Sequence, residues 1–367
     1  MAQFEIQLIA IVTAIACALP GAFLVLRRVS MLSDAISHAI LPGIVVAFFL
    51  TEDLNSPLLI VAAAATGVLT AASIETLSRT RRVREDAAIG LVFPVLFSIG
   101  VILIARYAGG VHLDVDAVLL GELAFAPFER VILAGADVGP KALWVMGIIL
   151  LVNVLFIAAF YKELKLSTFD PALAAALGFS PTILHYLLMG AVSFTAVGAF
   201  DAVGSILVVA LIVGPPATAY LLTDRLSVLL GISAALGAAA AVAGYWLAFL
   251  LDASIAGSMA TAVGAIFFLT FVFAPRQGLL AERSRRNSQK RRFAEHMLLV
   301  HLLHHQDTPD ELRESHRSHL EEHLRWKPDL AQSAIRLAVR DRLVAQDGEI
   351  LRLTDKGRTL AERTMIA

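Results

Sequence analysis

Residues 31–50 read MLSDAISHAILPGIVVAFFL, and this stretch indicates what kind of chain it belongs to. It is almost entirely apolar, and its length is close to the roughly 20 residues that cross a hydrocarbon core as a helix. Asp34 and His38 interrupt the apolar residues. Because ionisable side chains are costly within lipid, those found there usually serve a function. The stretch therefore predicts a membrane-spanning helix that carries candidate functional groups.

Similar apolar runs recur along most of the chain. They cover residues 4–26, 31–50, 56–77, 87–106, 142–161, 183–200, 202–222, 226–250 and 256–274. None alternates polar and apolar residues, so they favour helices over a membrane barrel. The short turn around Asp201 leaves open a re-entrant pair there. We therefore expect an all-α polytopic membrane protein with about eight or nine transmembrane helices.

Composition supports the same fold class. The 367 residues are 58% hydrophobic and 17% charged, with a mean hydropathy of +0.76. Soluble chains are typically about 45–50% apolar and about 25% charged. These values exclude an ordinary cytosolic enzyme and a disordered chain. The single cysteine, Cys17, excludes a disulfide within the chain.

Two of the apolar runs contain helix breakers. Pro42-Gly43 interrupts the second run and Gly214-Pro215-Pro216 interrupts the seventh. Proline removes a backbone donor and kinks a helix, and broken helices within membranes often frame transport sites. The alternative for each is a plain kink in a packed bundle.

The distribution of basic residues predicts the orientation in the membrane. If the N-terminus is outside, every inner loop is basic and most outer segments are acidic, as the positive-inside rule expects. The basic residues of the inner loops are Arg27, Arg28, Arg79, Arg81, Arg82, Arg84, Lys162, Lys165 and Arg225.

Asp34 and His38 are four residues apart, so they share one face of a helix. A carboxylate beside an imidazole suits Mn²⁺, Zn²⁺ or Fe²⁺. Two ligands do not complete a site, and Asp201 and backbone carbonyls near the broken helices are candidates for the rest. The alternative is a buried Asp–His pair that fixes helix packing.

A second group of candidate ligands lies in an outer segment. His112, Asp114 and Asp116 alternate with apolar residues, and in an extended chain they would face one side. They are candidates for gathering cations before entry, and the alternative is a solvated acidic loop.

Residues 168–181 (TFDPALAAALGFSP) predict a short helix on the inner side. Asp170 is a suitable N-cap, Pro171 fits the first helical position, and Gly178 is a plausible stop. Such an element could dock a partner, or it could be a simple surface helix.

The composition changes after the last apolar run. Residues 1–275 hold 12 Lys and Arg against 17 Asp and Glu, whereas residues 276–367 hold 18 against 14. We therefore predict a transmembrane domain over residues 1–280 and a cytoplasmic domain over 281–367. The basic run 283–292 favours contact with anionic membrane lipid over nucleic acid.

The order of elements in the tail is that of a winged helix-turn-helix. Helical patterns cover about 289–305, 309–325 and 329–345, a hairpin at 345–353 turns at Asp347-Gly348, and a last helix covers about 355–365. We therefore predict a small, cytoplasmic, winged-helix-like C-terminal domain.

Seven of the ten histidines lie in this tail. His301 and His305 share one helix face, and His316, His319 and His323 share another. Metal sensing and plain solvated helix faces are the two interpretations. The complete set is His296, His301, His304, His305, His316, His319 and His323.

Several catalytic motifs are absent from the sequence. It has no phosphate-binding G-x-x-x-x-G-K-[ST], no H-E-x-x-H and no G-x-S-x-G. The sequence thus predicts a membrane conduit that is not an enzyme and that has no ATP-binding motif of its own to power it.

Three motifs in order resemble one family. They resemble motifs in the permease subunits of the zinc, manganese and iron importers of the ABC superfamily. The three motifs are MLSDAISHAILPGI, YKELKLSTFDPALAAALGFSP and FDAVGSILVVALIVGPPATAYLLTDRL. The resemblance covers about residues 4–280, and VHLDVDAVLLGELAF is more similar to the manganese/iron branch.

This resemblance implies a permease in an ATP-driven importer of Mn²⁺, Fe²⁺ or Zn²⁺ in a bacterial cytoplasmic (inner) membrane, with no permanently bound cofactor. The implied partners are an ABC ATPase subunit, an extracytoplasmic metal-binding protein and a second permease subunit, identical or paralogous. The family's metal-path residues correspond to Asp34 and His38. Its ATPase-contacting helix corresponds to residues 168–181, with the coupling candidates Phe169, Asp170, Pro171 and Gly178.

The tail is similar to a different family. LRLTDKGRTLAER resembles the winged-helix domain of metal regulators of the diphtheria-toxin-repressor type. Binding of metal, a subunit or DNA remains open for the tail.

The residues also leave other functions open. Asp34 and His38 could act as a proton relay in a proton-coupled secondary metal transporter. The tail could make the chain a membrane-tethered metal-responsive regulator. The same Asp and His suit all three metals, so the sequence does not choose among them.

Overall fold

The computed structural model describes residues 2–52, 56–80, 82–107, 123–133, 136–319 and 326–366. The chain divides into two compact units, Met1–Ala274 and Pro275–Ala367. We call them the membrane unit and the tail unit, and each is described by itself.

The described part of the membrane unit contains nine helical segments long and apolar enough to cross a membrane, with α2 and α3 together forming one of them. This confirms the predicted all-α polytopic fold. The helices are α1 (Ala2–Arg27), α2 (Met31–Ala39), α3 (Leu41–Thr51), α4 (Pro57–Arg79), α5 (Glu85–Tyr107), α7 (Lys141–Ala159), α10 (Pro181–Val203), α11 (Ser205–Leu222), α12 (Leu226–Leu251) and α13 (Ile255–Phe273).

The two predicted helix breaks have different outcomes. The first is confirmed, because α2 ends at Ala39 and α3 starts at Leu41. The second is wrong, because α11 runs through Pro215 and Pro216 without interruption. Both prolines are buried, and α11 packs against α1, α12 and α13. Packing of this kind holds a helix together where proline has removed backbone donors.

Residues 198–204 do not form a re-entrant pair. Helix α10 continues to Val203 and caps its end at Gly204, whose φ of 77° suits glycine. Helix α11 then begins at Ser205 and has 18 residues of its own. Two separate spans therefore meet at a single glycine.

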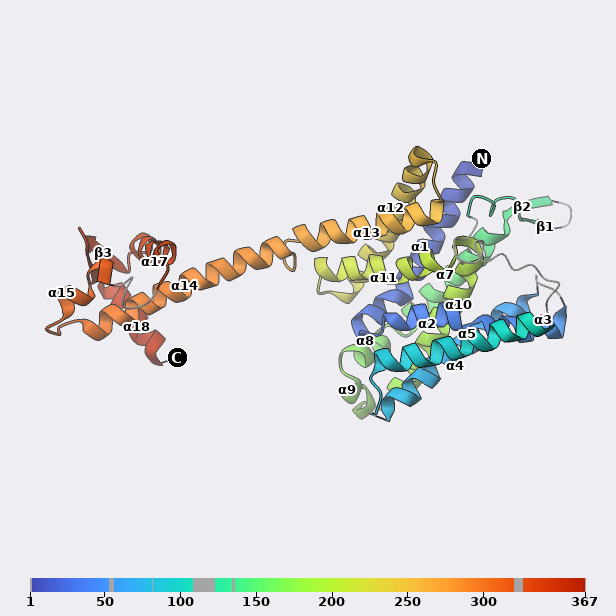
Figure 1. Cartoon of the computed structure of the whole chain (residues 1–367), viewed down its shortest axis with the longest axis horizontal. Coiled ribbons are helices and arrows are strands. Elements are labelled where there is room, and N and C mark those ends of the chain that lie inside the picture. Colours follow the sequence, from blue (N-terminus) through green and yellow to red (C-terminus); the bar gives the residue numbers. More distant parts are fainter. Residues whose placement is uncertain are drawn as a thin grey trace. The chain divides into compact units, whose positions relative to one another are not determined.

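Helix α1 lies at the centre of the membrane unit and contacts α7, α10, α11 and α12 (Figure 1). Small residues make this possible, because Ala10, Ala14 and Ala18 are completely buried. A Cβ atom at Gly21 would meet the backbone carbonyl of Ile212 on α11. Small residues let membrane helices approach closely, and here they place the first span among later ones.

A second group of helices packs beside this centre. Helices α2, α3, α4 and α5 contact one another, and α10 joins them to α1 through its contacts with α4 and α2. The far side of α5 is open, with Val95 59% and Ile102 64% exposed. An apolar surface of this kind suits lipid or a second subunit.

Four elements in the described part of the membrane unit lie outside the spans. Strands β1 (Arg130–Leu133) and β2 (Ala136–Pro140) form an antiparallel hairpin that the sequence analysis did not predict. Helix α8 (Tyr161–Phe169), also not predicted as a separate helix, precedes α9 (Pro171–Ala176).

Charged groups tie the β1–β2 hairpin to the N-terminal end of α1. Arg130 pairs with Glu5 at 3.2 Å and also with Asp137. The N–H of Gly139 and the guanidinium of Arg130 lower the pKa of Asp137. The Arg130–Glu5 ion pair therefore fixes the hairpin to the first span, and the Arg130–Asp137 pair joins its two strands.

The tail unit contains α14 (Leu279–His305), α15 (Glu311–Glu314), α17 (Pro328–Arg340), β3 (Val344–Asp347), β4 (Ile350–Leu353) and α18 (Asp355–Ile366). Its core includes Leu298, Leu299, Ile335, Leu343 and Leu351.

The predicted β3–β4 hairpin is confirmed, and Gly348 has the expected positive φ of 62° at its turn. The predicted single helix over 309–325 is wrong in its first half. Helix α15 ends at Glu314, and His316 forms an isolated β-bridge with Ile350.

Candidate functional site

Asp34 and His38 meet on one face of α2. Asp34 Oδ1 lies 3.6 Å from His38 Nε2, and the two side chains are 48% and 28% exposed. The opposite face of the helix is buried through Leu32 and Ile36. Packing of that apolar face fixes the direction in which the pair points.

The two serines of α2 support the helix rather than the pair. Ser33 Oγ donates to the carbonyl of Ser30 at 2.7 Å, and Ser37 Oγ donates to the carbonyl of Ser33 at 2.9 Å. Such bonds satisfy a hydroxyl inside an apolar bundle without a partner from another helix. The serines therefore add no ligand to the pair.

An aromatic side chain borders the pair. The His38 ring lies 5.6 Å from the ring of Phe93 on α5, at an interplanar angle of 47°. Helix α2 also contacts α4, α10 and α11. The pair thus sits on a half-helix that both groups of membrane helices contact.

The remaining predicted ligands lie outside the described part. His112, Asp114 and Asp116 belong to residues that the structure does not describe. Asp201 lies in the last turn of α10, and its side chain is outside the described part. Of the predicted metal ligands, the structure therefore describes the side chains of Asp34 and His38 alone.

The predicted docking segment has the local features that the sequence indicated. Asp170 Oδ1 accepts a hydrogen bond from the N–H of Leu173 at 2.9 Å, and Pro171 begins α9. Gly178 follows the helix with φ of 87°. Phe169, at the end of α8, is 59% exposed.

This segment also presents apolar side chains that the described part of the membrane unit leaves exposed. They are Phe169, Leu173, Leu177, Phe179 and Ile183, each between 41% and 61% exposed. Contiguous exposed apolar residues often mark an interaction surface.

A polar network that the sequence analysis missed holds α8 in place. Arg27, at the end of α1, donates to Ser167 Oγ at 2.9 Å and to Thr168 Oγ1 at 3.1 Å. Its third nitrogen lies 3.4 Å from His185 Nδ1 on α10, and His185 lies 4.0 Å from Glu75 on α4. The available signal was the presence of His185 and Glu75 within apolar runs.

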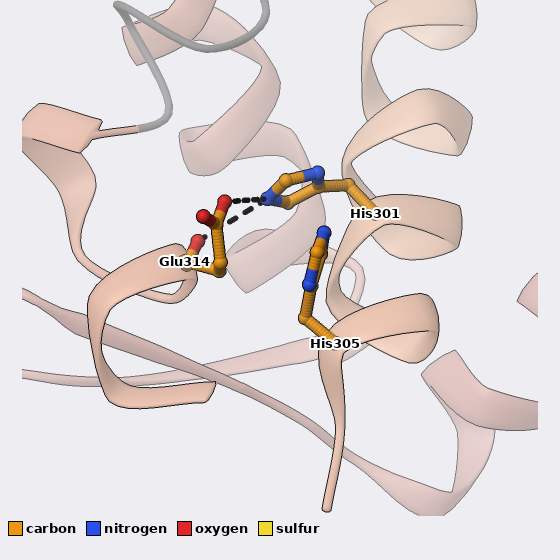
Figure 2. Close-up of side chains that lie close together, drawn as sticks. All are labelled: His301, His305 and Glu314. Carbon is orange, nitrogen blue, oxygen red and sulfur yellow. Dashed lines mark hydrogen bonds and ion pairs between the residues drawn. The ribbon is translucent and has the colours of Figure 1, made fainter. Parts of the chain in front are cut away.

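A second cluster of possible metal ligands lies in the tail unit. Ligand atoms of His301, His305 and Glu314 all lie within 4.8 Å of one another (Figure 2). The sequence pattern paired His301 with His305 but gave no reason to add Glu314, which comes from a separate helix.

Comparison with known proteins gives one family and several relatives. Residues 3–274 match the family model described as "ABC 3 transport family". The chain is 46% identical over 358 residues to the zinc transport system membrane protein TroD of Treponema pallidum (strain Nichols), covering 98% of this chain and 97% of that protein. It is also 46% identical over 293 residues to the manganese transport system membrane protein MntD of Bacillus subtilis (strain 168), covering 79% of this chain and 99% of that protein.

A solved structure shares the fold. PsaBC from Streptococcus pneumoniae, in complex with Fab, has a TM-score of 0.63 and 29% sequence identity, covering 76% of this chain and 94% of that chain. The alignment with TroD extends into the tail unit, whereas about four fifths of this chain matches nearly all of MntD.

Proposed function

The chain belongs to the ABC 3 transport family and is a membrane-spanning permease subunit of a divalent transition-metal importer, and we propose that Asp34 and His38 line its metal path. Relatives are named for zinc and manganese transport. A carboxylate with an imidazole can bind either metal, and Fe²⁺ as well.

The observation that carries this assignment is the exposure of Asp34. Its side chain is 48% exposed in the single chain, although the residue lies within a span. A charged group facing lipid is costly, so intramembrane carboxylates face a bundle interior or a water-filled cavity. The open side of the pair is therefore best explained as a surface toward a passage or a second subunit.

A second permease subunit would complete the set of ligands. Asp34 and His38 give two protein ligands, whereas Zn²⁺ commonly takes four. A twofold partner, identical or paralogous, would bring a second carboxylate and a second imidazole to the same axis. The exposed apolar side of α5 provides a further surface for such a partner.

We place the contact with an ABC ATPase subunit on α8 and α9. The exposed apolar residues there offer a docking surface, and the Arg27 network connects it to α1, α10 and α4. Movement of α8 imposed by the ATPase would reach the spans through these hydrogen bonds. Phe169, Asp170, Pro171 and Gly178 are the proposed coupling residues.

The remaining partners and the orientation follow from the same proposal. We place the N-terminus and the β1–β2 hairpin outside, where an extracytoplasmic metal-binding protein would deliver the ion. Residues from 281 onward would lie in the cytoplasm of a bacterial cell. The helices and the β3–β4 hairpin of the tail unit support a winged-helix assignment.

Metal uptake by the assembled transporter tests the role of the pair. The double variant Asp34→Ala/His38→Ala should abolish accumulation of radioactive Mn²⁺ or Zn²⁺ while the complex still assembles in the membrane. Asp86→Ala, an exposed carboxylate at the start of α5, is a matched control that should transport normally. Normal uptake by the double variant would remove Asp34 and His38 from the path.

The same assay separates this function from proton-coupled transport. Uptake into vesicles should stop when ATP is withheld and continue when an uncoupler collapses the proton gradient. The reverse result would show a proton-coupled transporter, the alternative in which Asp34 and His38 act as a proton relay.

A further inference from the structure

We propose that the tail unit holds a divalent transition-metal site of its own, formed by His301, His305 and Glu314, and that Zn²⁺ is its preferred ion. The site is separate from the Asp34–His38 pair, and the inference rests on the residues of the tail unit rather than on the proposed metal path.

Two different helices bring the three ligands together. His301 and His305 are one turn apart near the end of α14, and their ring centroids are 4.7 Å apart. Glu314 ends the short helix α15, and its Oε2 lies 3.5 Å from His301 Nε2. In Figure 2 the carboxylate of Glu314 lies beside the imidazole of His301, and the His305 ring lies next to that of His301. Two imidazoles and one carboxylate thus converge on a common point.

Burial distinguishes this cluster from a solvated group of side chains. His301 and Glu314 are each only 9% exposed, and Leu298, Leu299 and Leu302 nearby belong to the core of the tail unit. A buried carboxylate beside two imidazoles is a donor set that a divalent cation can bind. The ligand atoms all lie within 4.8 Å of one another, so they are near enough to share one ion.

A fourth residue is placed to orient the carboxylate. His319 Nε2 lies 3.0 Å from Glu314 Oε1, the oxygen opposite the one nearest to His301. Outer hydrogen bonds of this kind fix the direction of a metal-binding carboxylate. We therefore assign His319 as a positioning residue and not as a ligand.

The donor set determines the kind of metal. Two imidazole nitrogens and one carboxylate oxygen, with a fourth position for water, match the common tetrahedral coordination of Zn²⁺. Sites of mixed nitrogen and oxygen donors also bind Zn²⁺ more tightly than Mn²⁺ by the Irving–Williams order. Co²⁺ is a suitable spectroscopic substitute because it adopts the same geometry.

The experiment measures metal bound to the purified full-length chain in detergent. The background variant Asp34→Ala/His38→Ala removes the intramembrane pair, so any remaining stoichiometric binding belongs to another site. This background should bind one equivalent of Zn²⁺, and Co²⁺ added instead should give the visible d–d absorption of a tetrahedral site.

Two further substitutions in that background test the ligands. His305→Gln and Glu314→Gln should each weaken Zn²⁺ binding by about 100-fold. Changing a residue that only supports a metal ligand already costs about 10–100-fold in affinity, so loss of a ligand itself should lie at the upper end of that range. His296→Gln, on the same helix but outside the cluster, should bind like the background. Thermal unfolding of each metal-free variant verifies that it folds.

The outcomes separate this inference from the proposed function. Loss of the Zn²⁺ equivalent in both ligand variants, with retention in the His296 variant, supports the tail site whatever the uptake assay shows. Absence of binding by the background, or equal affinity in all variants, overturns the tail site and leaves the role of Asp34 and His38 unaffected. His305→Gln remains informative if Glu314→Gln fails to fold, because His305 is only partly buried.

Discussion

Gly21 shows how closely one residue can control the packing of a membrane helix. Any Cβ at this position would meet the carbonyl of Ile212, a backbone atom that cannot turn aside. We expect Gly21→Ala to destabilise the membrane unit by about 1–3 kcal/mol, the usual cost of overpacking. Gly147→Ala is the control, because no atom lies within 4 Å of its added methyl group. Thermal unfolding in detergent measures both, and equal stability of the two variants would contradict the packing argument.

Glu295 gives the tail unit a pH-dependent stability. Its side chain is only 2% exposed, and burial raises its pKa, with the charge of Asp341 adding to the rise. The folded state therefore holds the proton more tightly than the unfolded state, and its stability falls as the pH rises above the ordinary value of about 4.5. Glu295→Gln should stabilise the tail at pH 8, and the gain should shrink as the pH approaches 4.5.

Proteolysis at increasing temperature, followed by the appearance of tail fragments, measures the stability of the tail unit in the wild type and in Glu295→Gln at each pH. Glu282→Gln is a suitable control because that side chain is exposed and lies on the same helix. A gain from Glu295→Gln that stayed constant with pH would show that the carboxylate charge is not its cause.

The residues of the two candidate sites differ in how far they could be predicted. Asp34 and His38 are in contact because a helix places residues four apart on one face, so their spacing alone predicted the contact. The same rule paired His301 with His305. Glu314 joins them through folding between helices, and Arg27 meets Ser167 across 140 positions of the chain. Spacing along a sequence carries no information on such contacts.

At the scale of elements, α9 depends on its first cap. Asp170 supplies the hydrogen bond to the N–H of Leu173, and α9 has only six residues. Asp170→Ala should cost about 0.5–2 kcal/mol of local helix stability, whereas Asp170→Asn retains an accepting oxygen and should cost little. Hydrogen exchange over residues 171–177 measures the effect. We also expect uptake to fall in the alanine variant and to be restored in the asparagine variant.

The connection between α1 and α8 depends on the shape of a guanidinium. Arg27 contacts Ser167, Thr168 and His185 with separate nitrogens, which a lysine ammonium cannot reproduce. Arg27→Lys should therefore increase the rate of hydrogen exchange in α8 by about tenfold, because it removes one or more hydrogen bonds that contribute about 1 kcal/mol each. Arg28→Lys, the neighbouring control, should leave the exchange of α8 unchanged.

Elements were predictable where local chemistry determines them and not where packing does. Pro42 ends one half-helix and begins another, as proline alone would suggest. Pro215 and Pro216 do not interrupt α11, because both are buried in a helix that packs against α1, α12 and α13. The β1–β2 hairpin lacked an alternating apolar pattern, and an ion pair between Arg130 and Glu5 holds it to α1 instead.

At the scale of the molecule, the two units have separate cores. Buried residues of the membrane unit end before Pro275, and the tail core begins near Ala294. A relative matched over 99% of its length covers only 79% of this chain. We therefore expect a chain cut after residue 278 to insert, assemble and transport metal at a rate within about twofold of the full chain.

Uptake by reconstituted full-length and shortened complexes measures this. The shortened chain should also lack the Zn²⁺ equivalent assigned to the tail. Failure of the shortened chain to accumulate in the membrane would show that the membrane unit requires the tail to fold.

The central position of α1 also determines when the membrane unit can finish folding. Helix α1 is made first, yet its buried surface is covered by α11 and α12, which start at Ser205 and Leu226. At about 5–20 residues per second, roughly 200 further residues take ~10–40 s to synthesise. During that time the alanine-rich surface of α1 must wait in the bilayer or beside an insertion factor. A ribosome that stalls before α12 would thus leave an incomplete bundle, and quality-control proteases would find its first helix still uncovered.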